Sequence, residues 1–183
     1  MHWTVTGISG SGKSHYLKRF VIPAAKRNGV MVAVLDPVIP PKAAMREWGA
    51  DYVTADPFEL VKVLMQSKGV LTVIDEYGRY RKKFEYEQRL EWCTTEARNW
   101  GHLTHCCAQR LMMIPPSVRN NCDNAVVFRQ ARKDLAELAE HHDQPSLMDV
   151  AGWPKGLAYT VRPFEPLVKI RVFELRKGKP LIT

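Results

Sequence analysis

The chain has 183 residues and carries 27 lysines and arginines against 19 aspartates and glutamates, a formal charge of +8. This length suits one domain with a sizeable core and leaves little room for a second. The N-terminus shows no charged leader before an apolar core, and no apolar run reaches membrane-spanning length. We therefore expect a cytoplasmic protein with no signal peptide and no transmembrane segment. The basic charge allows an anionic partner without specifying one.

The first half of the chain alternates between strand and helix patterns. Short continuous apolar runs are typical of strands buried on both faces of a parallel sheet, and apolar stripes of wider spacing are typical of helices. Asp56 and Pro57 provide an N-cap and a first helical residue. The predicted strands cover residues 3–8, 30–35, 52–54 and 70–74, and the predicted helices cover 13–28, 42–48 and 56–67.

The second half continues this alternation and then changes its texture. Predicted helices cover residues 85–100, 115–120 and 133–141, and predicted strands cover 102–108 and 124–128. After Gly156, two β-rich runs at 157–162 and 167–175 indicate an antiparallel hairpin. The pattern predicts an α/β fold, a three-layer sandwich with a mainly parallel central sheet and a C-terminal β-hairpin. We expect one domain over 1–183, with a core over about 1–142 and a β-rich extension over about 143–183.

The segment from Gly7 to Ser14 matches the phosphate-binding pattern G-x-x-x-x-G-K-[ST] and lies between a predicted strand and a predicted helix. In such a P-loop, backbone N–H groups and the positive end of the helix face the phosphates. Lys13 should reach the β- and γ-phosphates, and the Ser14 hydroxyl should ligate Mg²⁺. The motif predicts a P-loop NTPase that binds ATP and Mg²⁺. The expected nucleotide-binding residues are Gly7, Ser9, Gly10, Ser11, Gly12, Lys13, Ser14 and His15.

Two further signals stand where predicted strands end. Asp75 and Glu76 follow one buried strand, and Gln109 follows another. Because ligands of open α/β sheets bind at the carboxyl ends of strands, Asp75 should hold Mg²⁺ and Glu76 should orient or deprotonate the attacking water. This carboxylate pair favours hydrolysis over transfer to a small-molecule acceptor. Gln109 is interpreted as a sensor of the γ-phosphate, and a capping amide in a turn is its alternative role.

The order of motifs over residues 3–140 is more specific than any one of them. In chain order they are Gly7 to Ser14, Asp36-Pro37, Val73 to Glu76, Glu96 to Gly101, Gln109-Arg110, Pro116 to Arg119, Val126 to Arg129 and Asp134-Leu135. This order resembles the FtsK/HerA superfamily of ring-forming DNA-pumping ATPases. The chain is nearly a bare motor core, and this is similar to the compact ATPases that package the genomes of membrane-containing viruses.

The resemblance implies a RecA/ASCE-like sheet in which the phosphate-loop strand is flanked by the Gln109 strand and then by the Asp75-Glu76 strand. It also implies a homo-oligomeric ring, a hexamer or a pentamer, with active sites between subunits and a capsid portal or vertex protein as a possible partner. An arginine near the γ-phosphate would stabilise the charge of the transition state. The candidates, in order of preference, are Arg129, Arg119 and Arg98.

The segment from Tyr77 to Phe84 directly follows the two carboxylates. It interleaves aromatic residues with Arg79, Arg81, Lys82 and Lys83, a composition suited to contact with a DNA backbone. A solvated basic loop is the plainer interpretation.

The leading hypothesis is a Mg²⁺-dependent, ATP-hydrolysing motor that translocates double-stranded DNA in viral genome packaging, in the host cytoplasm or associated with the virion. One alternative is a phage assembly or secretion ATPase of the zonula-occludens-toxin-like type with a protein cargo. A small-molecule kinase and a nucleotide-dependent adaptor without turnover are two further alternatives.

Overall fold

One sheet of eight strands organises the chain in the computed structural model, which describes residues 2–38 and 41–173. The strands are β1 (Trp3–Thr6), β2 (Val32–Leu35), β3 (Tyr52–Thr54), β4 (Leu71–Ile74), β5 (Leu103–Ala108), β6 (Asn124–Phe128), β7 (Leu157–Val161) and β8 (Val168–Arg171). They lie in the order β3-β2-β4-β5-β1-β6-β7-β8. All pairs among β1 to β6 are parallel, and β7 and β8 are antiparallel to their neighbours.

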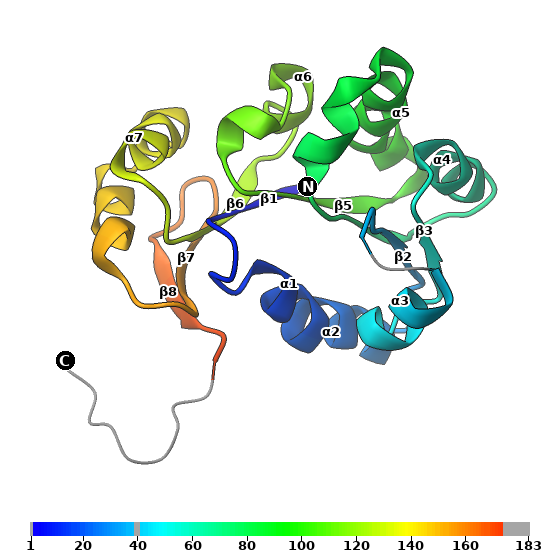
Figure 1. Cartoon of the computed structure of the whole chain (residues 1–183), viewed down its shortest axis with the longest axis horizontal. Coiled ribbons are helices and arrows are strands. Elements are labelled where there is room, and N and C mark those ends of the chain that lie inside the picture. Colours follow the sequence, from blue (N-terminus) through cyan, green and yellow to red (C-terminus); the bar gives the residue numbers. More distant parts are fainter. Residues whose placement is uncertain (1, 39–40, 174–183) are drawn as a thin grey trace.

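Helices cover both faces of this sheet, as Figure 1 shows. One layer contains α1 (Lys13–Tyr16), α2 (Ile22–Arg27) and α3 (Pro41–Trp48), and the other contains α4 (Pro57–Met65), α5 (Phe84–Thr95), α6 (Pro116–Arg119) and α7 (Arg132–His141). A 3₁₀ segment, η5 (Pro145–Gly152), packs beside α7. The three-layer α/β sandwich predicted from the sequence is confirmed, and so is the N-cap of α4, where Asp56 accepts a hydrogen bond from the Phe58 N–H at 2.9 Å.

The first strand lies in the middle of the sheet because both of its neighbours come from far along the chain. Strand β1 pairs with β5 on one side and with β6 on the other, and β4 lies beyond β5. Val5 is fully buried in the core between these strands and the first helices. This is the strand order that the resemblance implies, so the ends of β4, β5 and β1 reach the same edge of the sheet.

The first helical region is not the uniform α-helix predicted over 13–28, because a π-helical turn interrupts it. Between α1 and α2 the chain forms a π-helical turn, η1 (Leu17–Val21). Pro23 lies just inside α2 and has no N–H to donate to the preceding turn, so a wider turn accommodates it without the clash that an α-helix would suffer. The helical segment therefore stays continuous from the phosphate loop to Arg27.

The helix predicted over 85–100 is also divided, because α5 ends at Thr95 and a 3₁₀ segment, η3 (Ala97–Trp100), follows it. More consequential is the segment from Tyr77, which was expected to be a loop and forms a 3₁₀ helix, η2 (Tyr77–Lys82). Tyr77 and Tyr80 are buried in the core beneath α5. Their three-residue spacing puts both rings on one face of η2, so the interpretation of these aromatics as part of a DNA-gripping surface is wrong.

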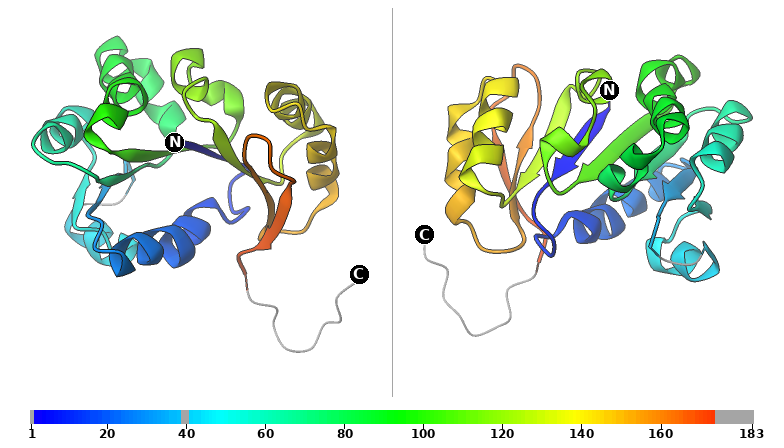
Figure 2. Two further views of the ribbon diagram at one scale, coloured as in Figure 1. Left: turned by 180° about the vertical axis from the view of Figure 1, so that it is seen from behind. Right: turned by 45° about the horizontal axis from the view of Figure 1, so that its top comes forward.

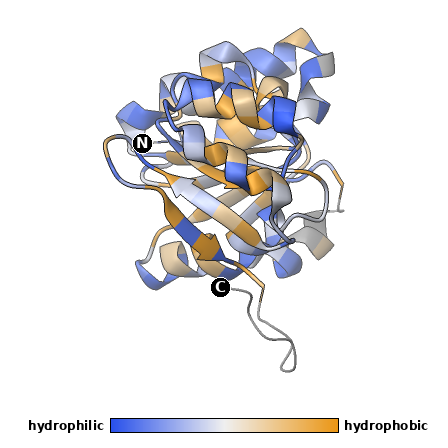
Figure 3. Cartoon of the chain, turned by 90° about the vertical axis from the view of Figure 1, so that its left-hand side faces the viewer, coloured by the Kyte–Doolittle hydropathy of each residue, from blue (hydrophilic) through white to orange (hydrophobic). Residues whose placement is uncertain are grey.

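The predicted C-terminal hairpin is confirmed and extends the same sheet. β7 pairs with β6, and β8 forms the exposed edge. Figure 3, which faces this side of the molecule, shows hydrophobic and hydrophilic residues alternating along β8, and Figure 2 shows the hairpin at the end of the sheet beyond β6. Glu174 and Leu175, which end the predicted second run, and the residues after them lie outside the described part. Within that part, no helix combines the length and apolar character needed to cross a bilayer.

Candidate nucleotide site

The phosphate loop is fixed at both sides by the strands next to β1. The N–H of Gly7 donates to the carbonyl of Ala108 at the end of β5, at 3.3 Å. The N–H of Ile8 donates to the carbonyl of Arg129 just after β6, at 3.0 Å. The loop therefore begins at the carboxyl edge of the sheet and delivers Lys13 and Ser14 to the first turn of α1.

Lys13 is held inside the loop. Its ammonium donates to the carbonyl oxygens of Gly7 at 2.7 Å and of Ile8 at 3.3 Å, and the residue is only 6% exposed. A lysine ammonium has three N–H donors, and loop carbonyls accept from two of them here. The cation is thus positioned in the loop before any phosphate arrives.

Ser14 and Asp75 meet across the edge of the sheet. The Ser14 hydroxyl donates to Asp75 Oδ2 over a long 3.5 Å, and Asp75 Oδ1 is buried without a hydrogen-bond partner among the described residues. Burial and the nearby charges of Glu76 and Asp36 raise the pKa of Asp75 to about 6. A hydroxyl beside an unsatisfied buried carboxylate oxygen is a donor set that fits Mg²⁺. These two residues would hold the ion, and a bound cation would favour the ionised carboxylate.

Asp36 is a third carboxylate near this point. It follows β2, is 2% exposed, and accepts hydrogen bonds from the Val38 N–H and from the indole N–H of Trp48, both at 2.8 Å. These bonds orient Asp36 within its own loop, and its negative charge contributes to the raised pKa of Asp75.

Glu76 has a left-handed backbone, with φ 48° and ψ 48°. A side chain with a β-carbon adopts this conformation at a cost of roughly 1 kcal/mol or more, so the surrounding fold must impose it. The Gln109 amide donates to Glu76 Oε2 at 3.4 Å. The two residues predicted to act on the attacking water and to sense the γ-phosphate therefore touch each other.

The segment after Gln109 is anchored to α7. Arg110 donates to Asp134 at 2.7 Å, and this aspartate is buried. This hydrogen bond connects the segment after β5 to α7 in the second layer of helices.

A cavity of about 230 Å³ opens over the phosphate loop and Glu76. Its lining residues are Ser9, Gly10, Gly12, Lys13, Ser14, His15, Glu76 and Phe173. Phe173 belongs to the segment after β8, which the sequence did not connect with the site. Two hydrogen bonds of 2.8 Å hold this segment in place, from the Gly156 N–H to the Ser11 carbonyl and from the Val172 N–H to the Gly156 carbonyl. No motif or spacing in the sequence indicates these contacts.

Lys155 is another residue near the site that no sequence motif indicates. Its Nζ atom lies 3.6 Å from the position that a β-carbon would take at Gly10, at the outer turn of the phosphate loop. The side chain is exposed, so its cation lies at the surface beside the loop. A lysine after a 3₁₀ segment carries no recognisable signal by itself.

The three candidate arginines occupy different edges. Arg129 is exposed, and its backbone contacts the phosphate loop. Arg98 acts electrostatically on His2, which precedes β1, and Arg119 lines a pocket with Asp123, which precedes β6. Arg98 and Arg119 are therefore at the amino ends of the strands, opposite the phosphate loop of their own chain.

The basic residues near η2 are partly engaged with the protein itself. Arg81 forms an ion pair with Glu87 at 3.2 Å and donates to the Met112 carbonyl at 2.8 Å. The Lys83 ammonium lies 4.8 Å from the centre of the Tyr86 ring. Arg79 is exposed, and the side chain of Lys82 lies outside the described part.

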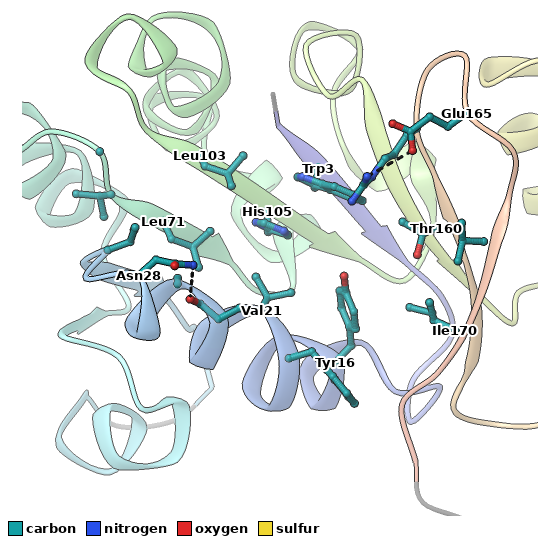
Figure 4. A pocket seen from close by; sticks show the side chains of 18 of the residues that line it. Trp3, Tyr16, Val21, Asn28, Leu71, Leu103, His105, Thr160, Glu165 and Ile170 are labelled. Atoms are coloured by element: carbon teal, nitrogen blue, oxygen red, sulfur yellow. Dashed lines mark hydrogen bonds and ion pairs between the residues drawn. The ribbon is translucent and has the colours of Figure 1, made fainter.

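A separate apolar hollow of about 680 Å³ lies on the face of the sheet between the first helical segment and the C-terminal hairpin. Figure 4 shows Trp3 and His105 on the sheet, Tyr16 pointing up from the helix, and Ile170 on the hairpin side. None of the residues predicted to bind nucleotide lines it. The hollow is therefore distinct from the cavity over the phosphate loop.

Comparison with known protein families shows which family this chain belongs to. Residues 3–94, half of the chain, match the model of the viral superfamily 1 RNA helicase core domain. The chain belongs to this family. The segment shared with the viral helicase core includes the phosphate loop, Asp75 and Glu76 and ends within α5. No protein of curated function matches the amino-acid sequence.

Solved structures share the fold over nearly the whole chain. The DNA-packaging ATPase B204 from Sulfolobus turreted icosahedral virus superposes with a TM-score of 0.76 at 14% identity, over 94% of this chain and 98% of that one. The genome-packaging NTPase B204 from Sulfolobus turreted icosahedral virus 2, in complex with AMP, gives 0.73 at 15% identity over 92% and 96%. VirB4 of Thermoanaerobacter pseudethanolicus gives 0.68 at 10% identity over 95% and 89%. The P-loop NTPase fold is confirmed, and the predicted resemblance holds at the level of the fold.

Proposed function

We propose that this protein is a Mg²⁺-dependent ATPase whose turnover moves double-stranded DNA during packaging of a viral genome, in the host cytoplasm or on the virion. One observation carries the proposal: the phosphate loop contacts Asp75 through Ser14 and shares a cavity with Glu76 at one edge of the sheet. Membership of a viral helicase family and the likeness to a DNA-packaging ATPase support a nucleic-acid motor. The whole described chain would act as one ATPase domain.

The residues divide the work of hydrolysis. Lys13 would exchange loop carbonyls for oxygens of the β- and γ-phosphates. Ser14 and Asp75 would hold Mg²⁺, which supplies positive charge beside the phosphates when bound. Glu76 would accept a proton from water as the water oxygen bonds to the γ-phosphorus and the bond to the ADP oxygen breaks. Gln109 would hold the Glu76 carboxylate in place through their hydrogen bond.

A homo-oligomeric ring of five or six subunits is part of the proposal. Arg98 and Arg119 lie at the edge opposite the phosphate loop, so either one could approach a γ-phosphate only from a neighbouring subunit. Arg129 lies at the loop and could act within its own subunit or toward the next. A capsid portal or vertex protein would be the partner on which such a ring assembles.

The enzyme assignment is tested by measuring ATP turnover with and without double-stranded DNA. We expect Mg²⁺-dependent turnover that DNA stimulates and that Glu76→Gln lowers by at least about 100-fold. Absence of hydrolysis by the wild-type protein, or turnover unaffected by Glu76→Gln, would refute the assignment.

The DNA role is tested by removing exposed charge near Glu76. The variant Arg79→Ala/Arg81→Ala/Lys83→Ala should weaken DNA binding and reduce the dependence of log K on log salt by up to about 3. The matched control is Arg27→Ala/Lys62→Ala/Lys68→Ala, which removes the same charge from other exposed positions. Equal losses in the two variants would indicate binding by net charge alone and would contradict a specific role for this segment.

RNA is the second candidate polymer, because the matching family model is that of an RNA helicase core. Turnover stimulated by single-stranded or duplex RNA, and not by double-stranded DNA at the same nucleotide concentration, would favour it. The same phosphate loop and carboxylates would serve both polymers.

A further inference from the structure

We infer that His15 and Phe173 form the subsite for the base of the bound nucleotide, so that the C-terminal hairpin completes the ATP site. This inference rests on the proposed function, because it concerns the same cavity. Both side chains line that cavity together with the phosphate loop and Glu76.

The topology of the sheet sets the direction in which a nucleotide must lie. Glu76 follows β4, which lies on the β5 side of β1, whereas Phe173 follows β8, which lies beyond β6 on the other side. The phosphate loop follows β1 and stands between them. A triphosphate that presents its γ-phosphate to Glu76 therefore directs its nucleoside end toward Phe173. Lys13 and Ser14 lie between the two ends of the cavity.

The chemistry at the Phe173 end suits a flat aromatic ring. The rings of His15 and Phe173 meet edge to face, with centroids 4.9 Å apart and planes inclined by 66°. Both side chains are half-buried, so each keeps surface that a ligand can cover. A nucleobase has a π-face that stacks on aromatic side chains whatever its hydrogen-bonding pattern. The subsite should therefore accept purine bases with little discrimination.

The position of Phe173 is built into the fold. A β-carbon at Gly156 would lie 2.3 Å from the Phe173 ring, and Gly156 has a φ of +85°. A β-carbon at Gly12 of the phosphate loop would lie 2.8 Å from Val172. Gly12 and Gly156 thus allow the segment after β8 to pack directly on the phosphate loop. Gly156 links the two, because it donates to Ser11 of the loop and accepts from Val172.

The experiment compares a ligand that has a base with one that does not. Calorimetry with ATP, GTP and inorganic tripolyphosphate, all with Mg²⁺, is carried out on the wild-type protein, Phe173→Leu and Phe173→Tyr. Leucine keeps apolar contact with Gly156 and removes the aromatic face, and tyrosine restores that face. The control is Phe164→Leu, which changes the fully exposed phenylalanine of the same hairpin.

We expect Phe173→Leu to weaken ATP and GTP binding by roughly 5- to 100-fold while the tripolyphosphate affinity stays within about twofold. Phe173→Tyr should restore ATP affinity, and Phe164→Leu should leave it unchanged. Unaltered ATP affinity in Phe173→Leu, or an equal loss for ATP and tripolyphosphate, would overturn the inference and leave the ATPase assignment standing. A wild-type protein that binds neither ligand would instead refute the proposed function itself, and the inference with it.

Discussion

The side-chain amide of Gln109 donates to the Glu76 carboxylate across 3.4 Å and so joins the ends of β5 and β4. We expect Gln109→Ala to reduce kcat by about 10- to 100-fold, because the carboxylate loses the group that orients it toward water. The affinity for ATP should stay within about threefold, since the phosphate loop is unchanged. Turnover and equilibrium binding measured on the same preparation test this expectation, and an unchanged kcat would remove Gln109 from the mechanism.

The left-handed backbone of Glu76 predicts an unusual ranking of stability. Glu76→Gly and Glu76→Gln both remove the carboxylate, but only glycine relieves the strain at φ 48°. We expect Glu76→Gly to be more stable than Glu76→Gln by about 1 kcal/mol in urea unfolding, whereas glycine destabilises most ordinary positions. The opposite ranking would mean that this conformation stores no strain.

The raised pKa of Asp75 predicts that its charge destabilises the protein when no metal is present. Folding favours the protonated form, so the contribution to stability is present below pH 4 and is lost as the pH rises through about 6. In a chelator at pH 8, Asp75→Asn should be more stable than the wild type by about 1–3 kcal/mol and should lack ATPase activity. At pH 4 the difference should vanish. A difference independent of pH would indicate a packing effect.

Two buried histidines, His105 and His2, predict that the free energy of unfolding falls as the pH falls, which is the opposite of the effect of Asp75. Burial lowers the pKa of His105 to about 3 and that of His2 to about 4. Because the unfolded chain takes up protons below about pH 6.5 and these folded side chains do not, stability is lost as the pH falls from 6.5 toward 4. His105→Gln should reduce the loss between pH 7 and pH 5 by about 1–2 kcal/mol. Urea unfolding at the two pH values tests it, and an unchanged loss would show that His105 titrates normally.

Lys155 beside the phosphate loop predicts a contribution to nucleotide binding. We expect Lys155→Ala to weaken ATP and tripolyphosphate equally, by about 3- to 10-fold, because an ammonium near the loop attracts phosphate charge. The effect should shrink at high salt. Lys169→Ala, on the neighbouring strand, is the matched control. Selective loss of ATP affinity alone would assign Lys155 to the nucleoside end instead.

The convergence of the phosphate loop, Asp75, Glu76 and Gln109 could be predicted because it needs only local information. Each group follows a buried strand, and parallel strands end at the same edge. The central place of β1 came from the resemblance, and the pairing confirms it.

Other features depend on packing, or on spacing signals that lie within a predicted loop or helix. Tyr77 and Tyr80 have the three-residue spacing of a 3₁₀ helix, and Pro23 inside a helical pattern indicates an irregular turn. The sequence thus held a signal for both corrections. Phe173 differs, because its contact with His15 follows from how the hairpin packs against the phosphate loop. No periodicity encodes such a contact between segments more than a hundred residues apart.

The central position of β1 has a consequence for the order in which the molecule can be made. Its strand partners begin at Leu103 and Asn124, and the bond from Gly156 to Ser11 comes later still. A chain that emerges N-terminus first exposes β1 with no strand partner until Leu103 and the residues after it have been translated. The backbone bonds that fix the phosphate loop are therefore complete only after Gly156 has been translated. Chains stalled before Gly156 should therefore aggregate without binding nucleotide, and the nucleotide site stays incomplete until this residue has been made.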